Sequence, residues 1–195
     1  MEQFKEVSQN YTLPEAIREA QRCLGCKVPG CKKGCPIGND IPDWISQLAK
    51  GNFGNAIEII RSRSNLPAVC GRVCAHERQC EGNCALAKSG KHINIGKLER
   101  FVADFDSAAG LDHDMIPEKT KGQVAVIGSG PAGLTIAGDL ARKGFNVEIF
   151  EMEREAGGVL LYGIPEYRLP KEVVRHEIAK ISALGVKFHL GVTIG

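Results

Sequence analysis

Cysteine is the residue type whose number and spacing most clearly indicate chemistry in this sequence. Eight cysteines lie between residues 23 and 84 of the 195-residue chain, and no cysteine follows them. The first group has the pattern C-x2-C-x4-C-x3-C-P, with its cysteines at Cys23, Cys26, Cys31 and Cys35. The second group has the pattern C-x3-C-x5-C-x3-C, at Cys70, Cys74, Cys80 and Cys84. Two groups of four thiolates match the ligand requirement of two 4Fe–4S clusters.

Zinc and disulfide bonds are the other chemistries that these cysteines allow. Four cysteines also bind a structural zinc ion, but such sites repeat C-x2-C, and only Cys23 and Cys26 have that spacing here. Disulfide bonds belong to secreted chains, whereas the amino terminus lacks the apolar core of a signal peptide. The sequence therefore favours clusters over zinc, and either over disulfides, and it predicts a cytoplasmic protein.

The charge and hydropathy patterns argue against two classes of partner. The formal net charge of +2 is too small to indicate binding to nucleic acid or to an anionic membrane. The longest uncharged run, residues 122–138, contains a glycine-rich turn and does not resemble a membrane span. We therefore predict neither a nucleic-acid partner nor a membrane partner.

A glycine-rich turn is the second feature with chemical meaning. The β-branched run at 123–127 leads directly into G-x-G-x-x-G, formed by Gly128, Ser129, Gly130, Pro131, Ala132 and Gly133. After a strand and before a helix, these glycines allow a tight turn, close approach of a pyrophosphate to the helix N-terminus, and tight helix–strand packing. Glu151 ends the next predicted strand, where its carboxylate can accept hydrogen bonds from a ribose diol and would repel a 2′-phosphate. The pattern predicts a dinucleotide site that does not hold NADP, and a role in packing alone is the weaker alternative.

Several other residues carry weaker signals. Gly157 and Gly158 fit either a further approach of backbone to ligand or an ordinary turn. The five histidines show no ligand spacing, and we expect most of them to be solvated. We expect Trp44 to belong to the core rather than to a cofactor site.

The elements that must position these residues fall into two parts. Periodicity predicts short helices near residues 12–24, 40–51, 56–60 and 95–108, separated by cysteine-bearing loops, with Thr12 and Asp40 as N-caps and Glu15 completing a capping box. The polar residues 110–122 predict a linker. Strands at 123–127, 146–150 and 186–190 then alternate with helices at 131–143 and 170–184, which predicts a parallel sheet whose first strand is buried. We predict an α-helical iron–sulfur domain over residues 1–115 and an α/β Rossmann-type dinucleotide-binding domain with a parallel sheet over residues 116–195.

Four motifs together resemble a known family: C-x2-C-x4-C-x3-C-P, C-G-R-V-C, G-S-G-P-A-G-L and Y-G-I-P-E-Y-R-L-P-K. Over nearly its whole length the chain resembles the glutamate synthase small (β) subunit, and it is similar to the N-terminal region of dihydropyrimidine dehydrogenase and to NADPH:ferredoxin oxidoreductase subunits. The resemblance implies two 4Fe–4S clusters, FAD at residues 128–133 and Glu151, and NADPH bound outside this chain as the hydride donor. It implies electron transfer to a partner such as a glutamate synthase large subunit, and it requires no catalytic side chain here.

The resemblance also implies which residues hold each group. One cluster would be held by Cys23, Cys26, Cys31 and Cys84, and the other by Cys35, Cys74, Cys80 and Glu99. Cys70 would then be spare, whereas simple counting in groups of four makes it a ligand. Arg168, which attracts no notice on the residues alone, would contact FAD, and Ile194 would lie by the adenine.

The family continues beyond the point at which this chain stops. A second dinucleotide fold for NADPH and the rest of the FAD site follow in the family, so we expect this chain to be a fragment that ends inside the flavin domain. Two other functions stay open: a non-catalytic, cluster-bearing module that docks to a partner, and a zinc-bound interaction domain fused to a nucleotide-binding fold.

Overall fold

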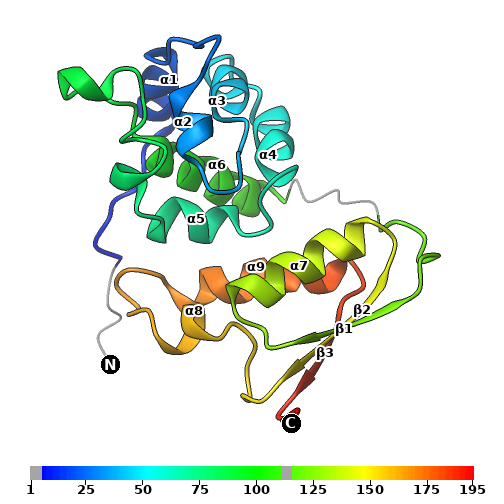
Figure 1. Ribbon diagram of the computed structural model, residues 1–195. Coiled ribbons are helices and arrows are strands. Elements are labelled where there is room, and N and C mark those ends of the chain that lie inside the picture. Colours follow the sequence, from blue (N-terminus) through cyan, green and yellow to red (C-terminus); the bar gives the residue numbers. More distant parts are fainter. Residues whose placement is uncertain (1–5, 111–115) are drawn as a thin grey trace. The chain divides into compact units, whose positions relative to one another are not determined.

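The computed structural model describes residues 6–110 and 116–195, and the chain divides into two compact units. Among the described residues, the helical unit comprises residues 8–110, and the α/β unit combines residues 6–7 with residues 116–195. Figure 1 shows the elements of both units. The predicted linker falls partly, at 111–115, outside the described residues, and the predicted domain boundary at residue 115 stays a prediction.

Short helices build the helical unit, as predicted. They are α1 (Leu13–Gln21), α2 (Gly30–Gly34), α3 (Ile41–Ala49), α4 (Phe53–Arg61), α5 (Pro67–Val73), η1 (His76–Arg78), η2 (Ala87–Ser89) and α6 (Ile95–Ala109). The long helix α6 contacts α1, α3, α4 and α5 (Figure 1). Residues 6–110 contain no strand. The expectation that cysteines lie in loops is wrong for Cys31 and Cys70, which lie within α2 and α5.

One apolar core holds these helices together. In α3, Ile41, Trp44, Ile45 and Leu48 follow helical spacing and are all buried, so Trp44 is a core residue as predicted.

The carboxylate of Glu15 accepts hydrogen bonds from the backbone N–H and the hydroxyl of Thr12, at 2.8 and 2.7 Å. Asp40 occupies the N-cap position of α3, but its carboxylate forms an ion pair with Lys32 instead of capping the helix.

The α/β unit alternates strands and helices. Its elements are β1 (Gln123–Ile127), α7 (Pro131–Arg142), β2 (Asn146–Glu151), α8 (Val159–Tyr162), α9 (Lys171–Ala183) and β3 (Lys187–Leu190). The three strands pair in parallel in the order β1-β2-β3, with Val126 opposite Ile149 and Ile149 opposite Phe188. Helices α7 and α9 lie together on one side of this sheet (Figure 1). The predicted Rossmann-type fold class is confirmed.

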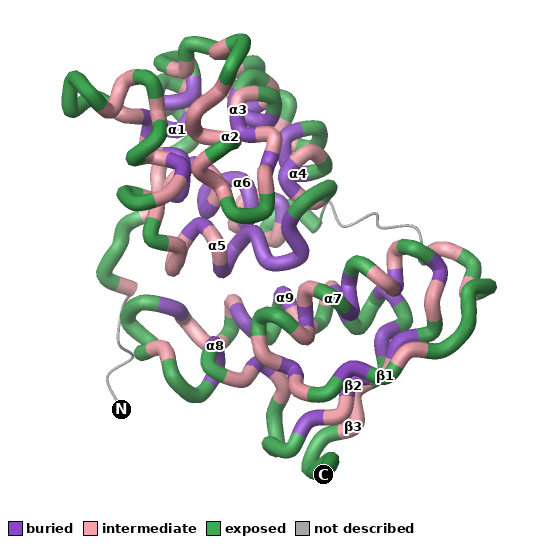
Figure 2. The backbone as a smooth tube through the Cα atoms, viewed as in Figure 1, coloured by how far each residue is buried: buried purple, intermediate pink, exposed green. Residues whose placement is uncertain are grey.

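Burial differs between the strands of the sheet (Figure 2). In β2, Val147, Ile149 and Glu151 are buried, and the residues between them are only half-buried. In β1 only Val126 is buried, and Ile127 is 70% exposed. The prediction that the first strand is fully buried is therefore wrong, because β1 has a single neighbouring strand and the described helices cover one face of the sheet.

Candidate iron–sulfur and dinucleotide sites

Four cysteines line one cavity of the helical unit, which we call the first cavity: Cys23 and Cys26 from one loop, Cys31 from α2, and Cys84. The other lining side chains carry only carbon, for example those of Ile41, Ile45 and Leu86. Burial raises the pKa of Cys23 and raises that of Cys31 to about 11. At neutral pH these groups are thiols until positively charged iron stabilises their thiolate forms.

The first cavity is small. Its volume of about 20 Å³ has room for about one water molecule. A four-iron core needs more space than this. A cluster bound here would require the loop that carries Cys26 to shift outward; on this loop Leu24 and Val28 are 63% and 70% exposed.

The remaining four cysteines line another cavity, which we call the second cavity. It has a volume of about 140 Å³, and its ionisable lining groups include Cys35, Cys70, Cys74, Cys80 and Glu99. Burial raises the pKa of Cys80 to about 12. A hydrogen bond between their side chains raises the pKa of Cys70 and lowers that of Cys74 to about 7.

Three other side chains of the second cavity carry buried polar atoms. Among the described residues, no hydrogen-bond partner exists for Nε1 of Trp44, Nε2 of His76 or Oδ1 of Asn39. Buried polar atoms in native proteins are normally paired. Unpaired atoms in a cavity lined with soft thiol ligands fit a bound iron–sulfur group, whose sulfurs can accept N–H hydrogen bonds.

His76 departs from the expectation that most histidines are solvated. It follows Cys74 by two residues, and this position inside the cysteine pattern was the available signal. A Cβ atom on Gly96 would lie 2.2 Å from Cε1 of His76, so the ring packs directly against the first turn of α6. In the described part of the chain, no three His, Cys, Asp or Glu side chains converge as ligands of one metal ion would.

Glycines in α2 explain how cysteines far apart in sequence share a cavity. A Cβ atom on Gly30 would lie 2.2 Å from the carbonyl oxygen of Asn83, and one on Gly34 would lie 2.7 Å from that of Gln79. Only glycine allows α2 to pack this closely against residues 79–83. This contact places the cysteines in and next to α2 beside cysteines of the second group.

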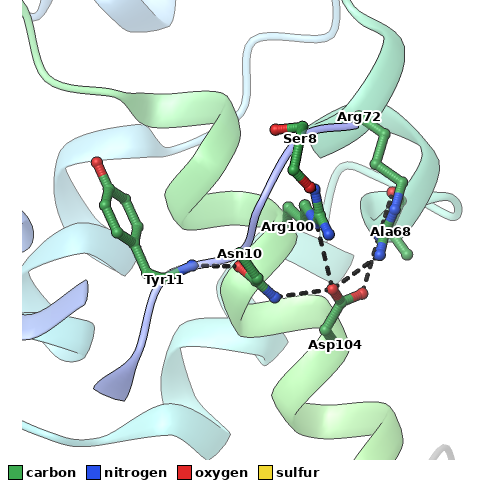
Figure 3. Close-up of polar contacts among 7 residues, drawn as sticks. All are labelled: Ser8, Asn10, Tyr11, Ala68, Arg72, Arg100 and Asp104. Atoms are coloured by element: carbon green, nitrogen blue, oxygen red, sulfur yellow. Dashed lines mark hydrogen bonds and ion pairs between the residues drawn. The ribbon is translucent and has the colours of Figure 1, made fainter. Parts of the chain in front are cut away.

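A polar network fixes α5 against α6 (Figure 3). The carboxylate of Asp104 accepts two hydrogen bonds of 2.8 Å from Arg72, one of 2.9 Å from Asn10 and one of 3.4 Å from Arg100. Arg100 also donates to the carbonyl of Ser8, at 2.6 Å. Bidentate arginine–carboxylate pairs of this kind fix orientation as well as distance.

Gly71 brings the same two helices close together. A Cβ atom at Gly71 would lie 2.5 Å from the backbone nitrogen of Arg100. Cys70 and Cys74 flank Gly71 in the sequence, and Glu99 precedes Arg100. The close approach of α5 to α6 therefore places both candidate fourth ligands, Cys70 and Glu99, in the wall of the second cavity.

The glycine-rich turn lies between β1 and α7, as predicted. Gly128 has a φ of +86°, and a Cβ atom on Gly133 would lie 2.0 Å from the carbonyl oxygen of Gly128. The space that a Cβ atom on Gly130 would occupy is open, and Gly130 is the N-cap of α7. Gly158 has a φ of +51°, and a Cβ atom added to it would lie 2.9 Å from Cα of Gly130. Gly158 therefore approaches the backbone of the glycine-rich turn.

Glu151 is buried beneath this turn. Its Oε2 accepts hydrogen bonds from the backbone N–H and hydroxyl of Ser129, at 2.7 and 2.5 Å, and its Oε1 accepts one of 2.9 Å from the N–H of Glu153. The Ser129 hydroxyl also accepts a hydrogen bond of 3.0 Å from the N–H of Gly157. Burial alone would raise the pKa of Glu151, but these hydrogen bonds outweigh burial and leave that pKa lowered.

Two other predicted FAD residues are exposed. Arg168 is exposed, on the loop between α8 and α9. Ile194 is 50% exposed and follows β3. The segment that carries Ile194 runs beside the end of β2, where the N–H of Val192 donates to the carbonyl of Glu151, at 2.9 Å. Pro131 and Ala132 form the first turn of α7.

The fold and the sites define a class of protein: a helical, cysteine-rich iron–sulfur domain followed by a Rossmann-like dinucleotide domain. Residues 1–111 match the family model described as dihydropyrimidine dehydrogenase domain II, 4Fe-4S cluster, and residues 126–179 match that of the NAD(P)-binding Rossmann-like domain. The chain belongs to the dihydropyrimidine dehydrogenase domain II family of 4Fe–4S proteins.

Curated relatives agree with this placement. The chain is 41% identical to the glutamate synthase [NADPH] small chain of Halomonas elongata over 99% of its length, which is 41% of that relative. It is 40% identical to the NAD-dependent dihydropyrimidine dehydrogenase subunit PreT of Escherichia coli K12, over 97% of this chain and 46% of the relative. The chain thus spans less than half of these relatives, and the resemblance predicted from the motifs is confirmed. In the described residues, no helix is both long and apolar enough to cross a membrane.

Proposed function

We propose that this chain is the electron-transfer part of an NAD(P)H-dependent oxidoreductase, with two 4Fe–4S clusters in the helical unit and FAD on the α/β unit. The observation that carries the proposal is that the eight cysteines divide between two cavities. Each cavity is lined by cysteines from both groups of the sequence. The names of the relatives, an NADPH-dependent glutamate synthase chain and an NAD-dependent dehydrogenase subunit, support the reaction class.

In this proposal each cavity holds one cluster. The first cavity uses Cys23, Cys26, Cys31 and Cys84, and the second uses Cys35, Cys74, Cys80 and Glu99, with Cys70 as the competing fourth ligand. A bound 4Fe–4S cluster supplies one-electron transfer at a potential set by its surroundings. The residues of the chain hold the iron, and the apolar walls keep water from it.

In the α/β unit, the N-terminus of α7 and the open space at Gly130 suit the pyrophosphate of FAD. Glu151 already accepts hydrogen bonds from Ser129 and Glu153, and a carboxylate has about four lone-pair sites. The backbone of Met152 also hydrogen-bonds to this carboxylate, so a ribose hydroxyl would share or replace one of these donors. The same buried negative charge would oppose a 2′-phosphate.

The remaining parts of the proposal concern partners outside this chain. A nicotinamide nucleotide, NADPH in the glutamate synthase case, would donate hydride from a site outside these residues, and a protein such as a glutamate synthase large subunit would accept the electrons. We place the protein in the cytoplasm, where cysteines stay reduced and available to iron.

Metal and flavin analysis of the full chain, purified anaerobically, tests the proposal. We expect about eight iron atoms and about eight acid-labile sulfides per chain, together with the broad visible absorption of 4Fe–4S clusters. FAD released by denaturation would be identified by chromatography. Stoichiometric zinc without iron would contradict the proposal and favour a zinc-bound interaction domain.

A further inference from the structure

The second cavity contains hydrogen-bond donors that nothing in the described chain uses. Trp44 is 1% exposed, and its Nε1 carries a hydrogen that can only be donated. His76 is half-buried and its Nε2 is fully enclosed; this nitrogen donates in the tautomer that carries the proton there. Both side chains line the cavity that Cys35, Cys74 and Cys80 share. A buried donor without a partner destabilises the fold, so a wall that carries two of them favours binding of a group with acceptor atoms.

The first cavity has no comparable side chains in its wall. Apart from its four cysteines, it is lined by glycine, alanine, proline, leucine and isoleucine, whose side chains carry no N–H or O–H group. Any difference in side-chain hydrogen bonding between two bound groups would therefore arise at the second cavity.

The positions of both donors are fixed by packing. Trp44 lies in the core face of α3, between Ile41 and Ile45. The His76 ring is held against Gly96, where any larger residue would collide with it. Asn39 differs from both, because its Nδ2 donates to the carbonyl of Ile60 at 3.4 Å and its unpaired atom is the acceptor Oδ1.

We propose that Trp44 and His76 donate N–H hydrogen bonds to sulfur atoms of the group bound in the second cavity and make that group easier to reduce. The inference rests on the proposed function, since it requires a 4Fe–4S cluster there. Reduction adds negative charge to the cluster, and an N–H donor stabilises the more negative state more strongly. Trp44 and His76 are thus positioning residues for the potential of one cluster.

The test compares four variants of the full chain, purified anaerobically: Trp44→Phe, His76→Leu, His76→Gln and, as a matched control, His176→Leu. His176 is exposed on α9 in the other unit. Iron is counted first, and the midpoint potential of each cluster is then followed by EPR during a reductive titration. Trp44→Phe keeps an aromatic ring but removes the donor, and His76→Gln replaces one N–H donor with another.

We expect Trp44→Phe and His76→Leu each to shift the reduction equilibrium of the same cluster about tenfold towards the oxidised form, or about 59 mV. The other cluster should keep its potential, His76→Gln should restore most of the shift, and His176→Leu should change neither. Unchanged potentials with full iron in both donor variants would overturn the inference and assign the unpaired atoms to buried water. Loss of iron in His76→Leu alone would overturn the hydrogen-bond role and make His76 a ligand. Absence of iron from the unmodified chain would instead reject the proposed function.

Discussion

The two cavities of the helical unit offer iron similar ligands in different surroundings. Each is lined by cysteines from both groups of the sequence pattern. The first has a wall of carbon, whereas the second adds a carboxylate at Glu99 and unpaired polar atoms at Trp44, His76 and Asn39. If each cavity binds a cluster, as we propose, the cysteine spacing indicates the sites, and the residues between the cysteines decide how the two clusters differ.

The glycine-rich turn of the α/β unit makes a third point of comparison. Its buried polar side chains, Ser129 and Glu151, hydrogen-bond to each other and to the backbone of Gly157 and Glu153. The turn is thus held in shape by its own residues, whereas the second cavity leaves buried atoms for a bound group to satisfy.

The largest expected effect comes from removing cysteine ligands of one cavity at a time. Such variants test whether the two cavities hold separate clusters. Cys84→Ser and Cys23→Ser should each abolish the same EPR signal, and Cys80→Ser should abolish the other, because Cys84 lines the first cavity and Cys80 the second. Each variant should keep about half of about eight iron atoms per chain. If Cys84→Ser and Cys80→Ser abolish the same signal, the cysteines divide by sequence group and the interleaved assignment is wrong.

The next effect concerns the fourth ligand of the second cavity. We expect Glu99→Ala to perturb the EPR signal of the second cluster and Cys70→Ser to leave the iron content unchanged. The resemblance favours Glu99, although thiolate is the softer ligand and Cys70 lies in the same wall. Loss of a cluster in Cys70→Ser, with none in Glu99→Ala, would show that simple counting of cysteines is right.

The sequence predicts those parts of the molecule that depend on residue type and local spacing. The cysteine groups, the turn at Gly128 and the parallel alternation of strands are of this kind. The meeting of α2 with residues 79–83 depends on backbone contacts at Gly30 and Gly34, which no local pattern encodes. Trp44 was predicted as a core residue, but its place beside a cavity follows only from tertiary packing. Burial of β1 was predicted wrongly, because it depends on what covers the sheet.

A smaller effect would sharpen the comparison by loosening α5 from α6, because α5 lines the second cavity alone, whereas Ile95 of α6 lines both cavities. The Arg72 side chain is 4% exposed and that of Asp104 is 28% exposed, so the pair is not fully buried. We expect Arg72→Met to lower the free energy of unfolding of the helical unit by about 2 kcal/mol, less than the 3–5 kcal/mol typical of a fully buried pair. Denaturant titration measures this change.

Arg175→Met is the matched control, since Arg175 is 48% exposed and pairs with Glu155 at 3.1 Å. It should change stability by less than about 1 kcal/mol. Arg72→Met should also release iron from the second cluster before the first as denaturant is added. Equal loss from both clusters would mean that the network of Asp104 supports the helical unit as a whole and does not distinguish the cavities.

The smallest expected effect concerns the glycine-rich turn of the α/β unit, whose buried polar side chains hydrogen-bond to the chain itself. The hydrogen bonds from Ser129 and Glu153 hold the pKa of Glu151 below its usual value of 4.5. A carboxyl whose pKa is lower in the folded state than in the unfolded state stabilises the fold above the unfolded pKa. That contribution is lost as the pH falls below about 4.5 and through the folded pKa.

Glu151→Gln should therefore lower the stability of the α/β unit by about 1 kcal/mol at pH 7, and the deficit should shrink in acid. Thermal unfolding between pH 7 and pH 3 measures this difference, and Glu153→Gln, an exposed neighbour whose backbone N–H still donates to Glu151, is the control. A deficit that is the same at every pH would show that Glu151 stabilises the turn through packing and not through its charge.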